Sequence, residues 1–412
     1  MSPGSPPGCS AETVFTAPGR AVPAGEIAAR MAGAAMGASL LSPAMTAPPI
    51  LDVLPPSEIF SPEAAGAISL MVARLFARSE AFAPLVLGPV TPLASFPGVA
   101  FRPVPPAFRP LRRALRYALG VRRIARAVSP ALIEVHNRPD IARFLATRGR
   151  APVVLCLQND PQGMRASGTA AARKALLGEL AGVIVASDFI RRRFLDGLPA
   201  ECGAKVAIVP NCLDLAHLPP PLPPEARAEE ILYVGRVVAD KGVDGFVAAC
   251  ALALPRLPGW RAGIIGADRF GAASPETPFL RGIRAAAAQA GIHMHGYRTH
   301  DQVLAAMARA AIVVVPSRWA EPFGLTAIEA MASGAALMTT RNGALPDLAV
   351  DAACYIDPDR VEEMAEALIA LAADPMRRGA LAEAGRKRAR DFDCGPILAT
   401  LDRLRHTITG RA

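Results

Sequence analysis

The chain has few aromatic side chains and no long apolar run. Only 5% of its 412 residues are Phe, Trp or Tyr, so we do not expect nucleic-acid bases to stack on it, and we expect no nucleic-acid partner. No stretch of about 18 uninterrupted apolar residues occurs. The Ala-rich stretch from Ile27 to Leu41 is too short, and it contains Arg30. The sequence therefore predicts no membrane-spanning helix.

The cysteines lack the spacing of a metal site. No Cys-x-x-Cys pair occurs, and no histidines are spaced to complete a zinc site. No group of carboxylates has metal-ligand spacing either, so we expect neither a metal nor another cofactor. Free thiols in a reducing cytoplasm are the simplest interpretation. The cysteines are Cys9, Cys156, Cys202, Cys212, Cys250, Cys354 and Cys394.

Residues 1–48 lack the basic stretch ahead of an apolar core that a signal peptide needs. They are rich in Pro, Gly, Ala and Ser, and they repeat these residues in low-complexity order. We interpret them as a disordered extension or as the product of an early start codon.

Beyond residue 48, short apolar runs alternate with longer helical patterns, as expected for βα units and parallel sheets. A chain of this length favours two domains, and the prolines of "LPPPLPP" (218–224) exclude a helix or central strand there. We predict two doubly wound, Rossmann-like α/β domains that face a cleft. Their bounds are 49–218 and 231–390, with a Pro-rich linker at 219–230 and a C-terminal helix in 391–412 that packs back on the first domain.

The strands follow the apolar runs. In the first domain we expect strands at 50–54, 84–88, 131–135, 152–157, 182–187 and 205–210. In the second we expect them at 231–235, 261–266, 292–296, 311–316 and 335–340. Asp357-Pro358 has the form of a helix start, and a last helix is predicted from Pro396 to Ile408.

The net charge of +9 is concentrated in one segment. Residues 101–150 contain twelve arginines against Glu134 and Asp140, so this segment alone carries +10. Two interpretations fit equally: a basic face that attracts an anionic membrane or acceptor, and a solvated Arg-rich helix.

Two stretches contain candidate binding residues. In "ILYVGRVVADKG" (231–242), a predicted strand ends at Gly235 and is followed by Arg236 and Lys241. Ligands of open α/β sheets collect beyond the carboxyl ends of strands, so these cations could bind a diphosphate. Cations after a strand are also commonly just solvated, and the Gly-x-Gly-x-x-Gly dinucleotide motif is absent.

The second stretch, "RWAEPFGLTAIEAMASG" (318–334), places Glu321 and Glu329 on either side of a Phe-Gly-Leu turn. Gly324 would let the backbone approach a ligand, and the amides of Phe323, Gly324 and Leu325 would form a helix N-terminus suited to phosphate. The alternative is a capping box, in which Glu329 pairs with Thr326 and only satisfies a backbone amide. Together, the cations, the helix start and the carboxylates fit one nucleotide-sugar pocket.

These motifs resemble the donor domain of a family 4 glycosyltransferase. The similarity runs through "YVGRVVADKG", "IIGADRF", "MHGYRTHDQVLAAMARAAIVVVPSRWAEPFGLTAIEAMASGAALMTT" and "NGALPDL", over about residues 231–348. "EPFGLTAIE" is similar to the family's Glu-x7-Glu motif. Weaker similarity continues in "FSPEAAGAIS", "VASDFIRRRF" and "VPNCLDL". The resemblance implies the two-domain GT-B fold.

The resemblance also implies residue roles. Arg236 and Lys241, after Gly235, would bind the donor diphosphate, Glu321 the transferred sugar and Glu329 the ribose. The amides of 323–325 would line the sugar and phosphate, and the loop Gly296-Tyr297-Arg298 would lie near the base.

The first domain departs from the family pattern. The frequent Gly-Gly pair is replaced by Ala65-Gly66, and the expected histidine position reads Gln158. His136, followed by Asn137, could serve instead or could be a satisfied strand-end residue. We therefore take Gly66, His136, Asn137 and Gln158 as acceptor-side candidates.

The implied reaction is retaining, metal-independent transfer of a sugar from a nucleoside diphosphate sugar to a glycan or lipid-linked acceptor. Synthesis of a cell-surface polysaccharide or lipopolysaccharide is the expected role, in the cytoplasm and at the inner face of the membrane through residues 101–150. A nucleotide-sugar epimerase or hydrolase of the same fold and a non-catalytic nucleotide-sugar binder are the alternatives.

Overall fold

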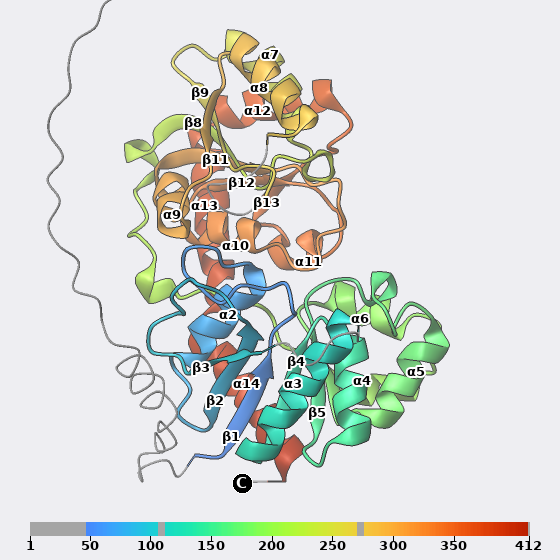
Figure 1. Cartoon of the computed structure of the whole chain (residues 1–412). Helices are drawn as coiled ribbons and strands as arrows, with labels where there is room; N and C mark the ends of the chain where they lie inside the picture. Colours follow the sequence, from blue (N-terminus) through green and yellow to red (C-terminus); the bar gives the residue numbers. More distant parts are fainter. Residues whose placement is uncertain (1–46, 106–111, 270–275, 411–412) are drawn as a thin grey trace, which may run out of the picture. The chain divides into compact units, whose positions relative to one another are not determined.

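The computed structural model describes residues 47–105, 112–269 and 276–410 (Figure 1). The predicted extension over 1–48 lies almost wholly outside them, as do Cys9 and Arg109. By its internal contacts, Ala47–Ala412 forms one compact unit. Within the described ranges, no helix is both long and apolar enough to cross a membrane.

The first half of this unit is built on a parallel sheet with strand order β3-β2-β1-β4-β5-β6-β7. The order reverses between β1 and β4, which marks the switch point where doubly wound sheets bind ligands. The strands are β1 (Pro49–Val53), β2 (Ala83–Pro89), β3 (Phe101–Val104), β4 (Leu132–His136), β5 (Val153–Leu157), β6 (Gly182–Val185) and β7 (Val206–Ile208). The helices are α2 (Ala67–Phe76), α3 (Arg113–Val128), α4 (Pro139–Arg148), α5 (Ala170–Glu179) and α6 (Asp188–Leu195).

The second half carries a parallel sheet of order β10-β9-β8-β11-β12-β13. Its strands are β8 (Ala228–Val234), β9 (Arg261–Ile265), β10 (His293–Gly296), β11 (Ala310–Val315), β12 (Ala336–Thr339) and β13 (Ala353–Tyr355). The helices are α7 (Val243–Ala253), α8 (Pro278–Gln289), α9 (His300–Arg309), α10 (Leu325–Ala332), α11 (Leu345–Ala349), α12 (Val361–Ala373), α13 (Pro375–Ala389) and α14 (Cys394–Thr409). Short 3-10 turns are η1 (Pro161–Gly163), η2 (Ala200–Lys205), η3 (Leu215–His217), η4 (Pro224–Ala226), η5 (Ala239–Lys241), η6 (Leu254–Arg256) and η7 (Arg390–Phe392).

The two parallel α/β sheets confirm the predicted fold class, and two strands were missed. β3 and β13 are only four and three residues long, and β3 contains Arg102 and Pro103, so neither gives an apolar run. The helix start predicted at Asp357-Pro358 is wrong, because α12 begins at Val361. The Asp-Pro start occurs one helix later, where the Asp374 side chain accepts a hydrogen bond from the Arg377 amide at the start of α13.

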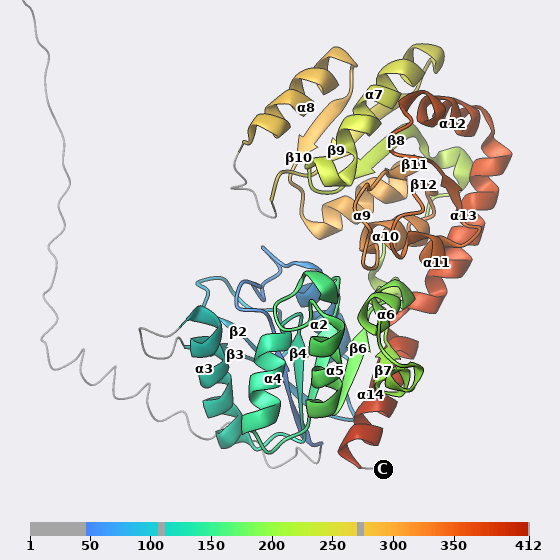
Figure 2. The same ribbon diagram turned by 90° about the vertical axis from the view of Figure 1, so that its right-hand side faces the viewer.

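Both sheets are buried on two faces, which explains their continuous apolar strands. Helices α3 to α6 pack on one face of the first sheet, and α2 and α14 pack on the other. On the second sheet, α7, α8 and α12 oppose α9, α10, α11 and α13. Figure 2 shows these layers from the side.

Helix α14 is anchored in the first sheet's core although it follows the second sheet in sequence. Leu398 and Leu401 join that core. Arg405 is fully buried and donates two hydrogen bonds to the Glu134 carboxylate of β4, at 2.9 and 2.8 Å. Burial alone would raise the pKa of Glu134, but the charge and hydrogen bonds of Arg405 hold the pKa below its usual value. This ion pair fixes the last helix against the first sheet.

The cysteines of the described ranges are free thiols, as predicted. Two of them meet, however: Cys212 Sγ lies 2.9 Å from Cys394 Sγ in the same core. Their separation of 182 positions explains why sequence spacing could not pair them.

Candidate functional site

The carboxyl ends of β8, β9 and β10 form a row of close backbone contacts. The Gly235 amide donates to the Ile265 carbonyl, and the Gly266 amide donates to the Gly296 carbonyl. All three glycines have positive φ. A Cβ on Gly266 would lie 1.8 Å from the Gly235 carbonyl oxygen, so only glycine fits there. This edge therefore presents backbone rather than side chains.

Arg236 follows directly after this edge. Its residue is exposed, and within the described ranges no hydrogen bond or ion pair engages its guanidinium group. Its carbonyl is fixed, because the Tyr233 hydroxyl donates to it at 2.7 Å. The side chain is therefore available to a ligand while its backbone is held in place.

Lys241 and Glu321 are in direct contact. Lys241 ends the turn η5, and its Nζ donates to Glu321 Oε1 at 2.6 Å across 80 positions of sequence. The backbone of Glu321 is fixed by a bridge to Gly343 and by the Ala344 amide, which donates to its carbonyl at 2.8 Å. The side chains of Lys241 and Glu321 are 23% and 11% exposed, so a ligand can reach the pair. Two predicted site residues thus meet beyond β8 and β11.

The Phe-Gly-Leu turn leads directly into α10. Gly324 has φ 105° and precedes the helix, whose first residue is Leu325. The first amides of a helix have no acceptor within it, so they can face a ligand. Phe323 is buried, and its ring meets the ring of Phe392 edge-on at 5.7 Å. Packing of Phe323 therefore holds the turn in place, while Gly324 and Leu325 are half-buried.

The capping-box interpretation of Glu329 is wrong. Thr326 lies within α10 rather than before it. The carboxylate of Glu329 instead accepts a hydrogen bond from His300 Nε2 at 2.8 Å, and Arg74 lies 3.7 Å away. Burial would raise the pKa of Glu329, but the hydrogen bond and charge of His300 and the charge of Arg74 keep the pKa below its usual value. Glu329 is thus an ionised, buried carboxylate.

Tyr297 and Arg298 follow the end of β10. The Tyr297 hydroxyl donates to the Glu63 carbonyl at 3.4 Å, and the exposed Arg298 donates to the Tyr297 carbonyl at 3.0 Å. Within the described ranges, neither residue forms a hydrogen bond or ion pair with Lys241 or Glu321.

Gly66 occupies the cap position before α2. A Cβ there would lie 2.6 Å from Glu58 Oε1, which accepts a hydrogen bond from the Ser69 amide at 3.2 Å. Only the flexible end of the Glu58 side chain would have to move to admit a Cβ, so packing alone does not require glycine at this position.

His136 and Asp52 form a buried pair at the ends of β4 and β1. His136 Nε2 lies 2.7 Å from Asp52 Oδ2. Burial would lower the pKa of His136, but the charge of Asp52 and its hydrogen bond raise the pKa above its usual value. Burial raises the pKa of Asp52, and His136 only partly opposes this. His136 thus has a partner at Nε2, while its buried Nδ1 has none among the described residues, so it is only partly satisfied.

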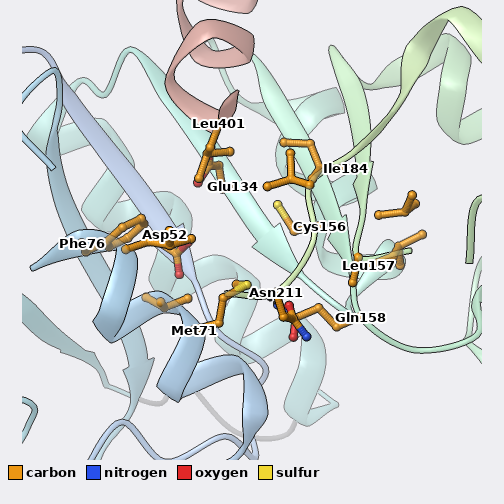
Figure 3. Close-up of a pocket in the computed structure, with 15 residues that line it drawn as sticks. Asp52, Met71, Phe76, Glu134, Cys156, Leu157, Gln158, Ile184, Asn211 and Leu401 are labelled. Carbon is orange, nitrogen blue, oxygen red and sulfur yellow. Dashed lines mark hydrogen bonds between the residues drawn. The ribbon is translucent and has the colours of Figure 1, made fainter. Parts of the chain in front are cut away.

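A small cavity of about 30 Å³ lies beside this pair (Figure 3). Asp52, Gln158 and Asn211 line it, and each has a buried side-chain oxygen without a hydrogen-bond partner. The side-chain Nε2 of Gln158 donates to Met71 Sδ at 3.1 Å, and its backbone N–H donates to Asn137 Oδ1 at 2.8 Å. The volume is enough for one or two water molecules, which could satisfy these oxygens.

The structure thus brings Lys241 and Glu321 into contact and leaves Arg236 unengaged beside Gly235. It also adds two residues that the sequence did not single out, Arg74 and His300. His300 is the first residue of α9, which follows the Gly296-Tyr297-Arg298 loop. Arg74 lies in the last turn of α2, on the first sheet, where nothing in the sequence points to the second.

Two family models match consecutive parts of the chain. "Glycosyltransferase Family 4" matches residues 76–217, and "Glycosyl transferases group 1" matches residues 219–388. Among curated relatives, the glycogen synthase of Mycobacterium tuberculosis is 31% identical over 215 residues, which cover 50% of this chain and 48% of that protein. The chain spans about half the length of the curated relatives it matches first.

Solved structures resemble the chain over more of its length. The sucrose-phosphate synthase of Thermosynechococcus elongatus has a TM-score of 0.71 at 19% identity and covers 88% of this chain and 99% of its own. Anabaena HepE, solved with UDP and glucose, has a TM-score of 0.68 at 18% identity. The match covers 86% of this chain and 98% of the HepE chain. These likenesses show the GT-B fold. Since the two family models together extend from residue 76 to residue 388, the chain belongs to the glycosyltransferases, with a first half of the family 4 type and a second half of the group 1 type.

Proposed function

We propose that this protein transfers a sugar from a nucleoside diphosphate sugar to an acceptor hydroxyl with retention at the anomeric carbon. The observation that carries the proposal is the contact between Lys241 and Glu321, beside the unengaged Arg236 and the turn before α10. Cations and backbone amides suit a diphosphate, and a carboxylate suits sugar hydroxyls. The binding of UDP and glucose by HepE, which shares the fold, supports this arrangement.

In this proposal, residues 231–390 bind the donor and residues 49–218 bind the acceptor. Arg236 and Lys241 bind the diphosphate, and the 323–325 amides line the phosphate and sugar. Glu321 accepts hydrogen bonds from the sugar, and Glu329 accepts them from the ribose. Gly235 allows the backbone to approach the donor, and Tyr297 and Arg298 lie near the base.

The reaction breaks the bond between the anomeric carbon and the leaving phosphate oxygen. The acceptor oxygen forms its bond to the same face of that carbon, and its proton passes to the leaving phosphate. Negative charge grows on the diphosphate, so Arg236, Lys241 and the amides stabilise the transition state without needing a metal. In the free protein Lys241 is paired with Glu321, and we infer that the donor takes the place of this pairing.

The acceptor is proposed to be a glycan or a lipid-linked glycan in polysaccharide or lipopolysaccharide synthesis. The likeness to a glycogen synthase, a polysaccharide-forming enzyme by its name, supports a glycan acceptor. Gly66, His136, Asn137 and Gln158 remain acceptor-side candidates. The exposed arginines of α3 support a location at the cytoplasmic face of an anionic membrane, and they are Arg113, Arg123 and Arg126.

A thermal-shift panel of nucleoside diphosphates and their sugars tests the donor site. A ligand at about 100 times its dissociation constant stabilises the folded state by about 2.7 kcal/mol. We expect one nucleotide series to raise the melting temperature, and no shift with any of them would overturn the proposal. Nucleotide release that requires an added glycan acceptor, and persists in EDTA, distinguishes a metal-independent transferase from a hydrolase or epimerase.

A further inference from the structure

Glu329 has two partners, a histidine and an arginine, that come from different parts of the chain. His300 begins α9 on the second sheet, and Arg74 lies in the last turn of α2 on the first. His300 Nε2 lies 2.8 Å from Glu329 Oε1, and an Arg74 guanidinium nitrogen lies 3.7 Å from the same oxygen. That nitrogen is also 3.4 Å from His300 Nε2, so the three side chains form one cluster.

The cluster uses only one of the two carboxylate oxygens. Both His300 and Arg74 approach Oε1, while Oε2 accepts no hydrogen bond from any side chain or amide in the described part of the chain. An ionised carboxylate is an acceptor only, so Oε2 can receive a hydrogen bond from a ligand hydroxyl. With Oε1 held on one side, Oε2 has a fixed direction.

Arg74 is itself held in place. Its second guanidinium nitrogen donates to the Cys212 carbonyl at 2.8 Å, and its side chain is only 13% exposed. Since the guanidinium group is planar and one of its nitrogens is anchored in this way, the side chain loses little further freedom when its other terminal nitrogen lies beside Glu329. The next arginine in the sequence, Arg78, lies just past the end of α2 and pairs instead with Asp214 at 2.5 Å.

We propose that His300 and Arg74 are positioning residues for the donor: they hold Oε1 of Glu329, so that Oε2 is oriented to accept a hydrogen bond from the ribose. This inference rests on the proposed function. Its consequence is that donor affinity depends on a side chain of α2, whose first turn begins beside the acceptor-side Gly66. Neither residue contacts the reacting sugar, so both should affect donor binding more than the chemical step.

The test uses the nucleoside diphosphate that gives the largest thermal shift among those of uridine, adenosine and guanosine, together with its 2′,3′-dideoxy form. Titration calorimetry on the full chain compares wild type with Arg74→Gln and His300→Gln. We expect each variant to bind the ribose form about tenfold more weakly than wild type does. The reason is that the variant weakens one charge-assisted hydrogen bond, from the ribose to Glu329. Wild type should bind the dideoxy form about tenfold more weakly than the ribose form. The variants should bind the two forms with nearly equal affinity. In turnover, KM for the donor should rise while kcat stays near wild type.

Controls separate positioning from folding. Arg78→Gln removes a neighbouring arginine, two residues past the end of α2, and should bind both nucleotides as wild type does. Arg74→Lys keeps the charge and should recover part of the lost affinity. Melting temperatures without ligand check that each variant is folded.

The inference is overturned if Glu329→Gln weakens nucleotide binding but Arg74→Gln and His300→Gln do not. It is also overturned if removal of the ribose hydroxyls lowers the affinity of these two variants as much as it lowers that of wild type. If no nucleoside diphosphate binds wild type, the proposed function itself fails and takes this inference with it.

Discussion

Charged side chains lie in or just beyond strands of both parallel sheets, but their partners differ. At the first sheet, Asp52 pairs with His136 and Glu134 pairs with Arg405, all within the core. At the second, Lys241 and Glu321 form a pair that solvent reaches, and Arg236 has no partner among the described residues. The Asp52–His136 pair leaves Asp52 Oδ1 and His136 Nδ1 without partners among the described residues, but these atoms face only a cavity of about 30 Å³ or the core. Partly exposed cations beside glycine backbone can exchange their partners for a diphosphate at small cost.

The comparison teaches that position at a sheet edge does not identify a binding residue by itself. Ligands of parallel α/β sheets collect at the carboxyl ends of the strands. Partly exposed charges lie there in both sheets, because Arg138 and Asp140 pair directly after β4 at the start of α4. The second sheet differs in that Arg236 has no partner among the described residues and lies with the Lys241–Glu321 pair beyond its strands. We therefore expect the buried charges of the first sheet to affect stability and the charges of the second sheet to affect catalysis.

The largest effect should come from the buried pair of the first sheet. Glu134→Ala leaves the fully buried Arg405 without its main partner, and loss of one member of a buried ion pair costs about 3–5 kcal/mol of unfolding free energy. Urea unfolding measures the loss. The matched control is Glu179→Ala, which breaks the exposed pair with Arg143 and should cost at most about 1 kcal/mol. Equal losses in the two variants would contradict the contrast between buried and exposed pairs.

A slightly smaller effect, now on activity, is expected at the second sheet. Lys241→Ala removes a donor aimed at the leaving diphosphate, which should raise the barrier by about 3 kcal/mol and lower kcat by about 100-fold. Steady-state kinetics with the donor identified by thermal shift measures this change. Lys174→Ala, an exposed lysine on α5 of the first sheet, should leave kcat unchanged. An unaltered kcat in Lys241→Ala would remove this residue from the proposed mechanism.

The sequence predicted the second sheet's site better than the first sheet's network, for physical reasons. Arg236, Lys241, Glu321 and Gly324 lie directly after strands or before a helix, where local pattern predicts position. The partners of Glu329 could not be found this way, because Arg74 and His300 are 226 positions apart and neither occupies a distinctive motif. The pairing of Glu134 with Arg405 spans 271 positions and depends wholly on how α14 packs.

The pH dependence of stability should also differ between the sheets. The pKa of His136 is raised by Asp52, so the pair's contribution is fully present below the usual histidine pKa of about 6.5. This contribution to stability is lost as the pH rises from about 6.5 through the raised pKa of His136 in the folded protein. The free energy of unfolding, measured by urea titration, should therefore fall over that interval. His136→Gln should remove this part of the fall, and a profile that does not change in the variant would refute the assignment.

The smallest effect concerns the exposed arginines of α3, the helix that packs on the first sheet. Arg123 and Arg126 lie exposed on α3, and each arginine near an anionic membrane contributes about 1 kcal/mol of attraction. Arg123→Gln and Arg126→Gln together should weaken co-sedimentation with phosphatidylserine vesicles by about 2 kcal/mol, a change of about thirtyfold. Binding should also fall as salt is raised, because the attraction is screened over about 10 Å at 0.1 M. Arg143→Gln is the control, since Arg143 is already neutralised by Glu179 and should change binding little. Equal binding of wild type and the double variant would leave α3 as a solvated helix, and the difference between the two sheets would then lie in their sheet edges alone.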